Sequence, residues 1–329
     1  MQGQHLVNHI THPELRGENT LHIVGVVSNA VRFHSRYRLA REWIKEMAVT
    51  KNVTLHVVEA AFGDRCLELK ELCDELGVDF MSVRTNSEIW IKENMINIGM
   101  RSVLVRYPTA KYLGWVDADV FFRDPNWAQE TMHQLQHFPV VQPWSDCADL
   151  GFQGNILQHF KSFGIQHQRR VPKQKHPNQK EYQYAHSGFA WCCTRQFFEA
   201  IEGLMDFPIL GSADHHMAFG MIGEVMDTVH GGMSDAFKRK AKEWEAKAMR
   251  ACKREVGFVM GRIEHGFHGP KKRRYYRERW QILIDHAFNP DTDLVKDGQG
   301  VLQLVGKPAL EQAIRLYNRS RYEDSIEEN

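Results

Sequence analysis

The sequence lacks the features that mark membrane, secreted and zinc-binding proteins. Its 329 residues contain no run of apolar side chains that approaches the length of a transmembrane helix, about 18 residues. Residues 1–20 mix His, Asn, Glu and Arg and have no apolar core of a secretory signal. The six cysteines show neither a paired framework nor Cys-x-x-Cys spacing. These absences predict a cytoplasmic protein with reduced thiols and no membrane segment.

An excess of charge of one sign is also missing. The 42 Lys and Arg side chains balance 41 Asp and Glu side chains, which gives a net charge of +1. This balance excludes a protein whose whole surface wraps nucleic acid, although local basic patches remain open. What is present is an ordinary globular composition, with 43% apolar and 25% charged residues. Without internal repeats or a flexible linker, the chain is expected to form one compact α/β unit.

Strand and helix patterns alternate along the first half of the chain. Apolar, β-branched runs predict strands at 20–29, 52–61, 79–84 and 111–122, and amphipathic spacing predicts helices at 36–49, 65–76 and 89–98. Such alternation is typical of βαβ units, in which helices cover both faces of a parallel sheet. Ligands of these sheets bind at the carboxyl ends of the strands, where we expect Ser28, Asn29, Glu59 and residues 117–119 to gather.

The second half of the chain predicts more helices than strands. Helices are expected at 127–137, 196–205, 213–222, 235–256 and 309–321, a strand at 138–143, an apolar segment at 188–193 and an exposed loop at 166–183. Ser212 is expected to cap the helix at 213–222. The helix at 235–256 has an apolar face made of Phe237, Ala241, Trp244, Ala248 and Cys252. The short acidic tail after residue 321 is predicted to be disordered.

Two carboxylates one residue apart, Asp117 and Asp119, interrupt the apolar run of the fourth predicted strand. On a strand both would project to the same side, because side chains repeat with a period of two. Neighbouring carboxylates repel each other, and burying them is costly unless a cation is present. A divalent metal with open positions is also how proteins bind a diphosphate. The alternative is turn chemistry that closes a buried strand.

Two later segments carry complementary chemistry. His265 and His268 lie three residues apart, beside glycines and the run of cations from Lys271 to Arg274, which suits a site for a metal and a phosphate. Carboxylates with one imidazole fit Mn²⁺ or Mg²⁺ better than structural zinc. Asp214, in the first turn of a predicted helix, would accept a hydrogen bond from a substrate hydroxyl or remove its proton. A solvated basic loop and a plain capping role are the alternatives.

The order of these three elements resembles that of metal-dependent glycosyltransferases of the GT-A fold. The resemblance implies a Rossmann-like mixed sheet flanked by helices, with a helical C-terminal extension. In that family an Asp-x-Asp pair, matched here by Asp117 and Asp119, binds Mn²⁺ or Mg²⁺ that bridges the diphosphate of a nucleotide sugar. A downstream histidine often completes the metal shell. His268 directly precedes Gly269 and is favoured over His265, although the spacing leaves both open.

A closer resemblance covers nearly the whole chain, which is similar to a group of predicted glycosyltransferases of bacteriophages and some bacteria. It is carried by Ser28-Asn29 with Arg32-Phe33, by Trp90 to Asn94, Trp115 to Asp119, Gly188 to Trp191 and Ala213 to His216, and by His265 to Arg274. The match supports fold and reaction class and leaves the acceptor unassigned.

The resemblance also implies roles for individual residues at the donor. These are Ser28, Asn29 and Glu59 for the nucleoside, Arg32, Lys92 and Asn94 for ribose or phosphate, and Lys271 or Arg273 for the leaving diphosphate. His186, Gly188 and Trp191 resemble the acceptor-side segment. The alternatives are local capping for Ser28 and Asn29, surface ion pairing for Glu59 and Arg32, and a buried core position for Trp191.

The predicted activity is transfer of a hexose or pentose from a UDP- or GDP-sugar to an acceptor hydroxyl. Residues 20–143 would bind the nucleotide sugar and 144–308 would form the acceptor-side half of the same domain, flanked by an extension at 1–19 and by a helix and acidic tail at 309–329. One acceptor is a hydroxymethylated base in phage DNA, and the other is a protein or polysaccharide hydroxyl. Cations that would favour DNA are Arg169, Arg170, Lys173 and Lys175, the basic face of 235–256, and residues 271–279 with their aromatic neighbours.

Two other classes of protein are compatible with the same patterns. A nucleotidyltransferase shares a carboxylate pair and a similar sheet, but usually has a glycine-rich basic loop after its first strand. Residues 28–35 contain no glycine. The other class is a non-catalytic module that binds nucleotide sugars.

Overall fold

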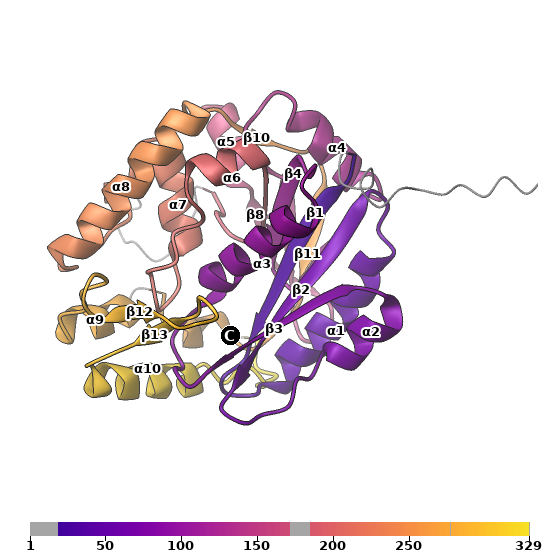
Figure 1. Cartoon of the computed structure of the whole chain (residues 1–329). Coiled ribbons are helices and arrows are strands. Elements are labelled where there is room, and N and C mark those ends of the chain that lie inside the picture. The colour runs from indigo at the N-terminus through magenta and orange to yellow at the C-terminus, as the bar shows by residue number, and fades with distance from the viewer. Residues whose placement is uncertain (1–18, 172–184, 277, 329) are drawn as a thin grey trace, which may run out of the picture.

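A seven-stranded mixed sheet with helices on both faces organises the chain in the computed structural model, which describes residues 19–171, 185–276 and 278–328 (Figure 1). Its strands are β1 (Leu21–Ser28), β2 (Val53–Phe62), β3 (Asp79–Thr85), β4 (Tyr112–Val116), β6 (Val140–Gln142), β9 (Ala190–Thr194) and β10 (Val256–Phe258). They lie in the order β10-β6-β9-β4-β1-β2-β3, and β9 runs antiparallel to both of its neighbours. The predicted mixed sheet flanked by helices is therefore confirmed.

The first four strands create a switch in the winding of the sheet. β1 pairs in parallel with β2 on one side and with β4 on the other. The chain winds outward from β1 to β3 and then returns to the opposite side of β1. Ligands of open α/β sheets bind at such a switch point, outside the carboxyl ends of the strands. The fold thus directs attention to the residues that follow β1 and β4.

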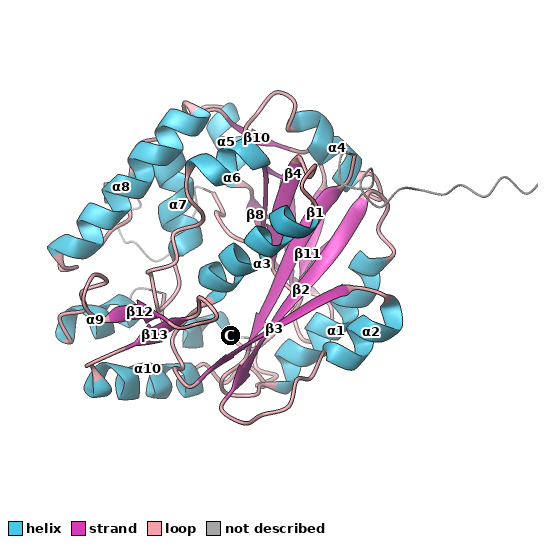
Figure 2. Cartoon of the chain, viewed as in Figure 1, coloured by secondary structure: helices cyan, strands magenta, loops and turns pink. Residues whose placement is uncertain are grey.

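Helices lie on both sides of the sheet (Figure 2), and alternate residues along the strands divide the core between these two layers. Ile23 packs in the cluster that contains α1 (His34–Ala48), α2 (Lys70–Leu76) and α4 (Trp127–Gln134). Val24 packs in the cluster on the other face, with α3 (Lys92–Arg106), α6 (Arg195–Ala200), α7 (Ala213–Met221) and α8 (Asp235–Cys252). Gly25 permits the close approach of α1, because a Cβ there would lie 2.1 Å from the ring of Trp43.

A second sheet takes over the chain directly after β4. It has the order β5 (Val120–Phe122), β11 (Arg262–His265), β7 (Asp146–Leu150) and β8 (Ile156–Lys161). The prediction of one strand over 111–122 is therefore wrong. The backbone N–H of Val120 donates to the carbonyl of Asp117 at 3.1 Å, so residues 117–119 form a turn between two sheets. Asp117 and Asp119 do not share one face of a strand.

The remaining elements are α5 (Phe163–Gln168), α9 (Glu278–Asp285), a hairpin of β12 (Leu294–Lys296) and β13 (Leu302–Leu304), and α10 (Pro308–Ser320). The apolar face predicted for 235–256 is buried in α8, although the helix ends at Cys252 and Val256 begins β10. Helix α2 begins only at Lys70, and α3 extends to Arg106. The predicted loop at 166–183 begins inside α5, and its residues 172–183 lie outside the described residues.

The six cysteines all lie in described segments and form no disulfide. Within the described ranges, no helix combines the length and the hydropathy that a membrane crossing requires.

Candidate active site

A cavity of about 210 Å³ lies at the carboxyl ends of β1 and β4. Its wall includes Ser28 from the end of β1, Asp117 and Asp119 from the turn after β4, His265 from the end of β11, and Asp214 from the first turn of α7. The fold therefore brings the acidic turn, the late histidine element and the acidic helix start to one place. His268 and Lys92, also expected at the site, line the same cavity.

The turn after β4 and the end of β11 meet because β5 pairs with β11. In that antiparallel pairing Val120 lies opposite His265. The N–H of Gly266 donates to the carbonyl of Asp119 at 2.8 Å and holds the two segments together. The side chains of Asp119, His265 and His268 each offer a ligand atom, and these atoms all lie within 4.8 Å of one another. The Oδ2 atom of Asp119 lies 3.8 Å from Nε2 of His265 and 3.2 Å from Nε2 of His268.

A buried carboxylate orients each histidine. Nδ1 of His265 lies 2.7 Å from Oδ1 of Asp149, and Nδ1 of His268 lies 3.1 Å from Oε2 of Glu323. A carboxylate only accepts, so each Nδ1 donates, and a neutral imidazole then presents the lone pair of Nε2 to Asp119. Carboxylate–histidine pairs of this kind are typical of metal sites, where they fix the ring and its tautomer.

The electrostatics of this cluster fit a divalent cation. Oδ2 of Asp119 and the Nε2 atoms of His265 and His268 face one another. The second carboxylate oxygen of Asp119, Oδ1, is buried and has no hydrogen-bond partner in the described residues. One carboxylate and two imidazoles suit Mn²⁺ and related divalent ions. Burial would raise the pKa of Asp119, but the two histidines outweigh burial and hold this pKa well below the usual range.

Asp117 lies beside this cluster but has a different partner. Its Oδ1 forms an ion pair with Nζ of Lys92, which lines the cavity. Burial lowers the pKa of Lys92, but the carboxylates of Asp117, Glu93 and Asp214 raise this pKa by more than burial lowers it, so the ammonium stays charged. Burial raises the pKa of Glu93 to about 7, although Lys92 opposes this shift. The two aspartates that were predicted to act together thus have different partners: Asp119 belongs to the candidate metal cluster, and Asp117 pairs with a lysine.

Four arginines complete the wall of the cavity: Arg36, Arg274, Arg279 and Arg321. Arg274 ends the run of cations predicted to suit a phosphate and Arg279 ends the range predicted to favour DNA, whereas Arg36 and Arg321 were not predicted at the site. Arg36 lies in the first turn of α1, the helix that follows β1. Its short distance in sequence from the carboxyl end of the first strand could have predicted its place at the site. No comparable local signal marks Arg321, which follows α10. The cavity is therefore strongly basic around its acidic cluster, as a site for phosphate groups would be.

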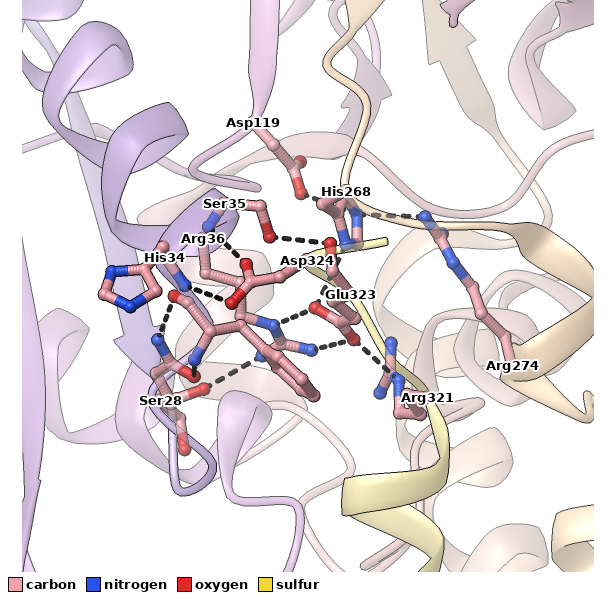
Figure 3. A network of polar contacts seen from close by, with 12 residues as sticks. Ser28, His34, Ser35, Arg36, Asp119, His268, Arg274, Arg321, Glu323 and Asp324 are labelled. Atoms are coloured by element: carbon pink, nitrogen blue, oxygen red, sulfur yellow. Dashed lines mark hydrogen bonds and ion pairs between the residues drawn. The ribbon is translucent and has the colours of Figure 1, made fainter. Parts of the chain in front are cut away.

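The acidic tail, predicted to be disordered, packs against this wall (Figure 3). Glu323 is 1% exposed, and its carboxylate accepts from Nη2 of Arg36 at 2.7 Å and pairs with Nε of Arg321 at 2.7 Å. Asp324 accepts from the backbone N–H groups of His34 and Ser35 at 2.9 and 2.7 Å, at the start of α1. The prediction of disorder is wrong because buried cations and open helix N–H groups supply the partners that the tail lacks locally.

Asp214 occupies the first turn of α7, as predicted. Burial would raise its pKa, but Lys92, His186 and His215 lower it, and the carboxylate is ionised. Gly188 brings the backbone close to this group, because a Cβ there would lie 2.7 Å from Oδ2 of Asp214. His186 accepts at Nδ1 from the N–H of Gly188 at 3.1 Å, and burial lowers its pKa to about 3, so its proton is on Nε2.

Ser212 does not cap α7, which contradicts the prediction. Its φ is 75°, and its side chain makes no capping hydrogen bond. The Ser212 hydroxyl instead accepts from Arg279 and from Nε1 of Trp280, the latter at 3.1 Å. Of the two histidines that follow Asp214, His216 is buried against Thr228, with 2.7 Å between Nδ1 and Oγ1.

Three residues expected at the nucleoside or ribose have local partners instead. Asn29 closes the turn after β1, because its side chain bonds to both the N–H and the carbonyl of Phe33 at 2.9 Å. Glu59 accepts from the N–H groups of Glu68 and Leu69 at 2.8 and 3.0 Å, at the start of α2. Arg32 is 58% exposed and forms an ion pair with Glu68. None of the three lines the cavity.

Three further predicted donor residues also lie outside the cavity wall. Asn94 is buried and anchors the β13 segment, donating to the carbonyl of Gly300 at 3.1 Å and accepting from the N–H of Leu302 at 3.1 Å. Lys271 pairs with Asp149 at 2.5 Å, behind His265. Arg273 lies over the ring of Tyr322 at 4.7 Å. Lys271 therefore acts on the cavity through the carboxylate that orients His265.

No protein-family model matches the chain, and no curated protein matches it. Among solved structures it is similar to a proposed nucleotide-diphospho-sugar transferase from Desulfovibrio desulfuricans G20, at 11% identity and a TM-score of 0.35, over 92% of this chain and 97% of that chain. It is also similar to a proposed glucose-1-phosphate thymidylyltransferase from Bacillus anthracis, in complex with a sucrose, at 9% identity and a TM-score of 0.36, over 74% and 88%. At these TM-scores the likeness carries no argument about function.

Proposed function

We propose that this protein is a metal-dependent glycosyltransferase that moves a sugar from a nucleoside-diphosphate sugar to an acceptor hydroxyl. The observation that carries the proposal is the cluster of Asp119, His265 and His268 in a basic cavity at the switch point of the sheet. The resemblance of the sequence motifs to GT-A glycosyltransferases supports the same reaction class. The donor would use mainly residues 20–143, although both histidines come from the later part of the chain.

Asp119, His265 and His268 would hold the cation, and Asp117 lies next to them. A bound Mn²⁺ or Mg²⁺ would offset the negative charge that develops on the leaving diphosphate. Nε2 of His268 accepts from Arg274 at 3.1 Å. A bound cation would take over this lone pair and would leave the guanidinium available to a phosphate oxygen beside the cluster. Lys92 keeps its charge and would contribute to the same electrostatic stabilisation.

Asp214 would serve the acceptor. The carboxylate is ionised and lies against Gly188, whose missing side chain leaves room for the carboxylate itself at the cavity wall. It would accept the proton of the acceptor hydroxyl as that oxygen attacks the anomeric carbon, and the diphosphate would leave with the bonding electrons. This arrangement favours a single displacement with inversion.

A panel of nucleotide sugars with Mn²⁺, scored by released nucleoside diphosphate, tests the proposal. We expect turnover with one UDP- or GDP-sugar, and its loss on addition of a chelator or on replacement of Asp117 or Asp119 by Ala. Full activity in chelator would contradict it. Pyrophosphate released from a nucleoside triphosphate would instead identify a nucleotidyltransferase, and tight binding of a nucleotide sugar without turnover would identify a binding module.

For the acceptor, a hydroxymethylated base in DNA and a protein or polysaccharide hydroxyl are separate outcomes. Arg169 and Arg170 are exposed at the end of α5, whereas Lys173 and Lys175 lie outside the described residues. Retention on DNA that falls steeply with salt would support the DNA acceptor. Absence of retention at low salt would leave the protein or polysaccharide hydroxyl.

A further inference from the structure

The cations of the cavity wall divide into two groups by their partners. Lys92 pairs with Asp117, and both Arg36 and Arg321 pair with Glu323. In the part of the chain that the structure describes, Arg274 and Arg279 form no ion pair with a carboxylate, although both line the cavity. An unpaired buried cation is costly, so a site that keeps one is built for an anionic ligand.

Arg279 is the more deeply buried of these two cations. It is 7% exposed, and its partners are the neutral hydroxyl of Ser212 and the ring of Tyr276, whose centroid lies 5.2 Å from Cζ. Its Nε has no hydrogen-bond partner among the described residues. Gly211 permits this position of the guanidinium, because a Cβ there would lie only 3.2 Å from Nη1. The guanidinium is thus oriented by neutral groups and keeps donors for a ligand.

The two unpaired arginines lie beside different groups of the proposed site. Arg274 contacts His268 of the candidate metal cluster, and its Nη1 donates to the hydroxyl of Tyr276 at 3.2 Å. Arg279 lies over the ring of the same tyrosine and bonds to Ser212, two residues before Asp214. Tyr276 therefore stands between a cation at the donor diphosphate and a cation beside the proposed base.

The electrostatics around Tyr276 agree with a surplus of positive charge. Desolvation of the hydroxyl raises the pKa of Tyr276, whose side chain as a whole is 48% exposed, but Arg274, Arg321 and Arg279 together lower this pKa below its usual value.

We propose that Arg279 forms a second anion site, which binds a carboxylate or phosphate group of the acceptor or of the transferred sugar. Anion binding at Arg279 follows from its burial and partners alone, whereas the source of the anion rests on the proposed function. The planar guanidinium suits both groups, because each can accept two parallel hydrogen bonds.

Sulfate binding to the full chain, measured by calorimetry with UDP and Mn²⁺ at saturation, tests this site. We expect sulfate to bind in addition to UDP, and Arg279→Gln to weaken sulfate binding about 30-fold or more while UDP binding stays unchanged. Arg274→Gln should have the opposite pattern. Arg239→Gln, on the exposed side of α8, is the matched control and should change neither. Arg279→Met removes the charge at similar volume and carries the test if the glutamine variant does not fold.

Two comparisons identify the source of the anion. If Arg279→Gln weakens the binding of UDP-glucuronate but not that of UDP-glucose, the anion belongs to the transferred sugar. If the same variant weakens the binding of glucuronate or glucose 6-phosphate to the UDP-loaded protein, the anion belongs to the acceptor.

Sulfate that displaces UDP one for one, or that binds Arg279→Gln as tightly as the unaltered chain, would overturn the second site. If UDP and GDP fail to bind with Mn²⁺ while sulfate still binds in an Arg279-dependent way, the anion site stands and the proposed function fails.

Discussion

Strand β1 begins in one buried polar cluster and ends in another, and the two clusters are built differently. At its start, Nδ1 of His22 lies 3.0 Å from Nε2 of His56, and His56 pairs with Asp79 at 3.1 Å. Asp79 also accepts from Arg106 at 2.8 Å and from the hydroxyl of Tyr107 at 2.9 Å. The carboxylate in this cluster has three donors within the protein.

The carboxylate at the other end of the strand is in the opposite situation. Asp119 faces two histidines through Oδ2, and its buried Oδ1 has no hydrogen-bond partner in the described residues. Nearby, Arg279 is buried and pairs with no carboxylate of the described ranges. Native proteins rarely leave such groups unsatisfied unless a ligand or ion completes them. The comparison teaches that incomplete partnering, more than burial or charge, separates a binding cluster from a structural one.

The largest effect is expected from Asp119→Asn. The variant loses a charged ligand atom, so we expect loss of Mn²⁺ binding and a decrease in turnover of about a thousandfold. The unfolding free energy without metal should fall by about 1–2 kcal/mol, because Oδ1 has no hydrogen bond to lose but the contacts of Oδ2 with the two histidines are weakened. Calorimetry with Mn²⁺, diphosphate release and urea denaturation measure the three quantities. If turnover of the variant is undiminished, Asp119 is not a ligand-binding carboxylate and does not differ in this respect from Asp79.

Glu323→Gln should be the most destabilising change. Two buried guanidiniums lose their counter-ion, and breaking such a network costs about 3–5 kcal/mol. We also expect weaker Mn²⁺ binding, by about tenfold, because His268 loses the carboxylate that orients it. Glu327→Gln is the matched control, since Glu327 is 57% exposed and pairs with Arg273 at 3.6 Å. If both variants unfold at the same urea concentration, the tail is not part of the cluster.

Gly188→Ala should separate turnover from donor binding. The added Cβ would lie 2.7 Å from Oδ2 of Asp214 and 3.0 Å from Cε1 of His186, so one of these side chains must move. We expect turnover to fall about tenfold to a hundredfold, because small displacements of reacting groups are costly, while UDP–Mn²⁺ affinity stays constant. Gly231→Ala, where no atom lies within 4 Å of the added Cβ, should change neither. Equal losses in binding and turnover would argue against an acceptor-side role.

The smallest effect is expected from Asp79→Asn, which should lower the unfolding free energy by about 1–2 kcal/mol and leave turnover unchanged. The hydrogen bond from His56 is the main reason that the pKa of Asp79 is lowered to about 2 from 3.8, although burial opposes the shift. The folded state thus binds this proton less readily than the unfolded state. The contribution of Asp79 is therefore complete above about pH 4 and is lost as the pH falls toward 2.

Urea midpoints between pH 2 and 6 measure this dependence. The unaltered chain should lose more stability on acidification than Asp79→Asn does. Equal losses in the two proteins would show that Asp79 is not a main source of the acid sensitivity.

The alternation of strands and helices made the sheet predictable, because apolar period and β-branched content are local properties. The break between β4 and β5 was not, because the apolar run continues through Val120 and Phe122. The turn forms only because β5 finds β11 as a partner, and β11 begins at Arg262. Motifs located Asp117, Asp119, His265 and His268 in one site, but their division of labour depends on Lys92 and the second sheet.

The orienting carboxylates show the limit of sequence reasoning most clearly. Asp149 and Glu323 have no motif around them, and each acquires a role only by lying next to a histidine from a distant segment. Asn94 and Glu59 show the opposite case, because the structure gives each of them a partner within the protein. Their sequence neighbourhood suggested ligand contacts, whereas β13 and the start of α2 supply their partners.

The position of Glu323 has a consequence for synthesis. A ribosome makes the chain from the N-terminus, so Arg36 is synthesised 287 residues before the carboxylate of Glu323 with which it pairs. The metal cluster would acquire its last orienting group only when residue 323 has left the ribosomal tunnel. A product interrupted before that residue would carry two uncompensated guanidiniums, and would be less stable as well as inactive. The orienting carboxylate of His268 thus reaches the site after the other segments that form it have been made.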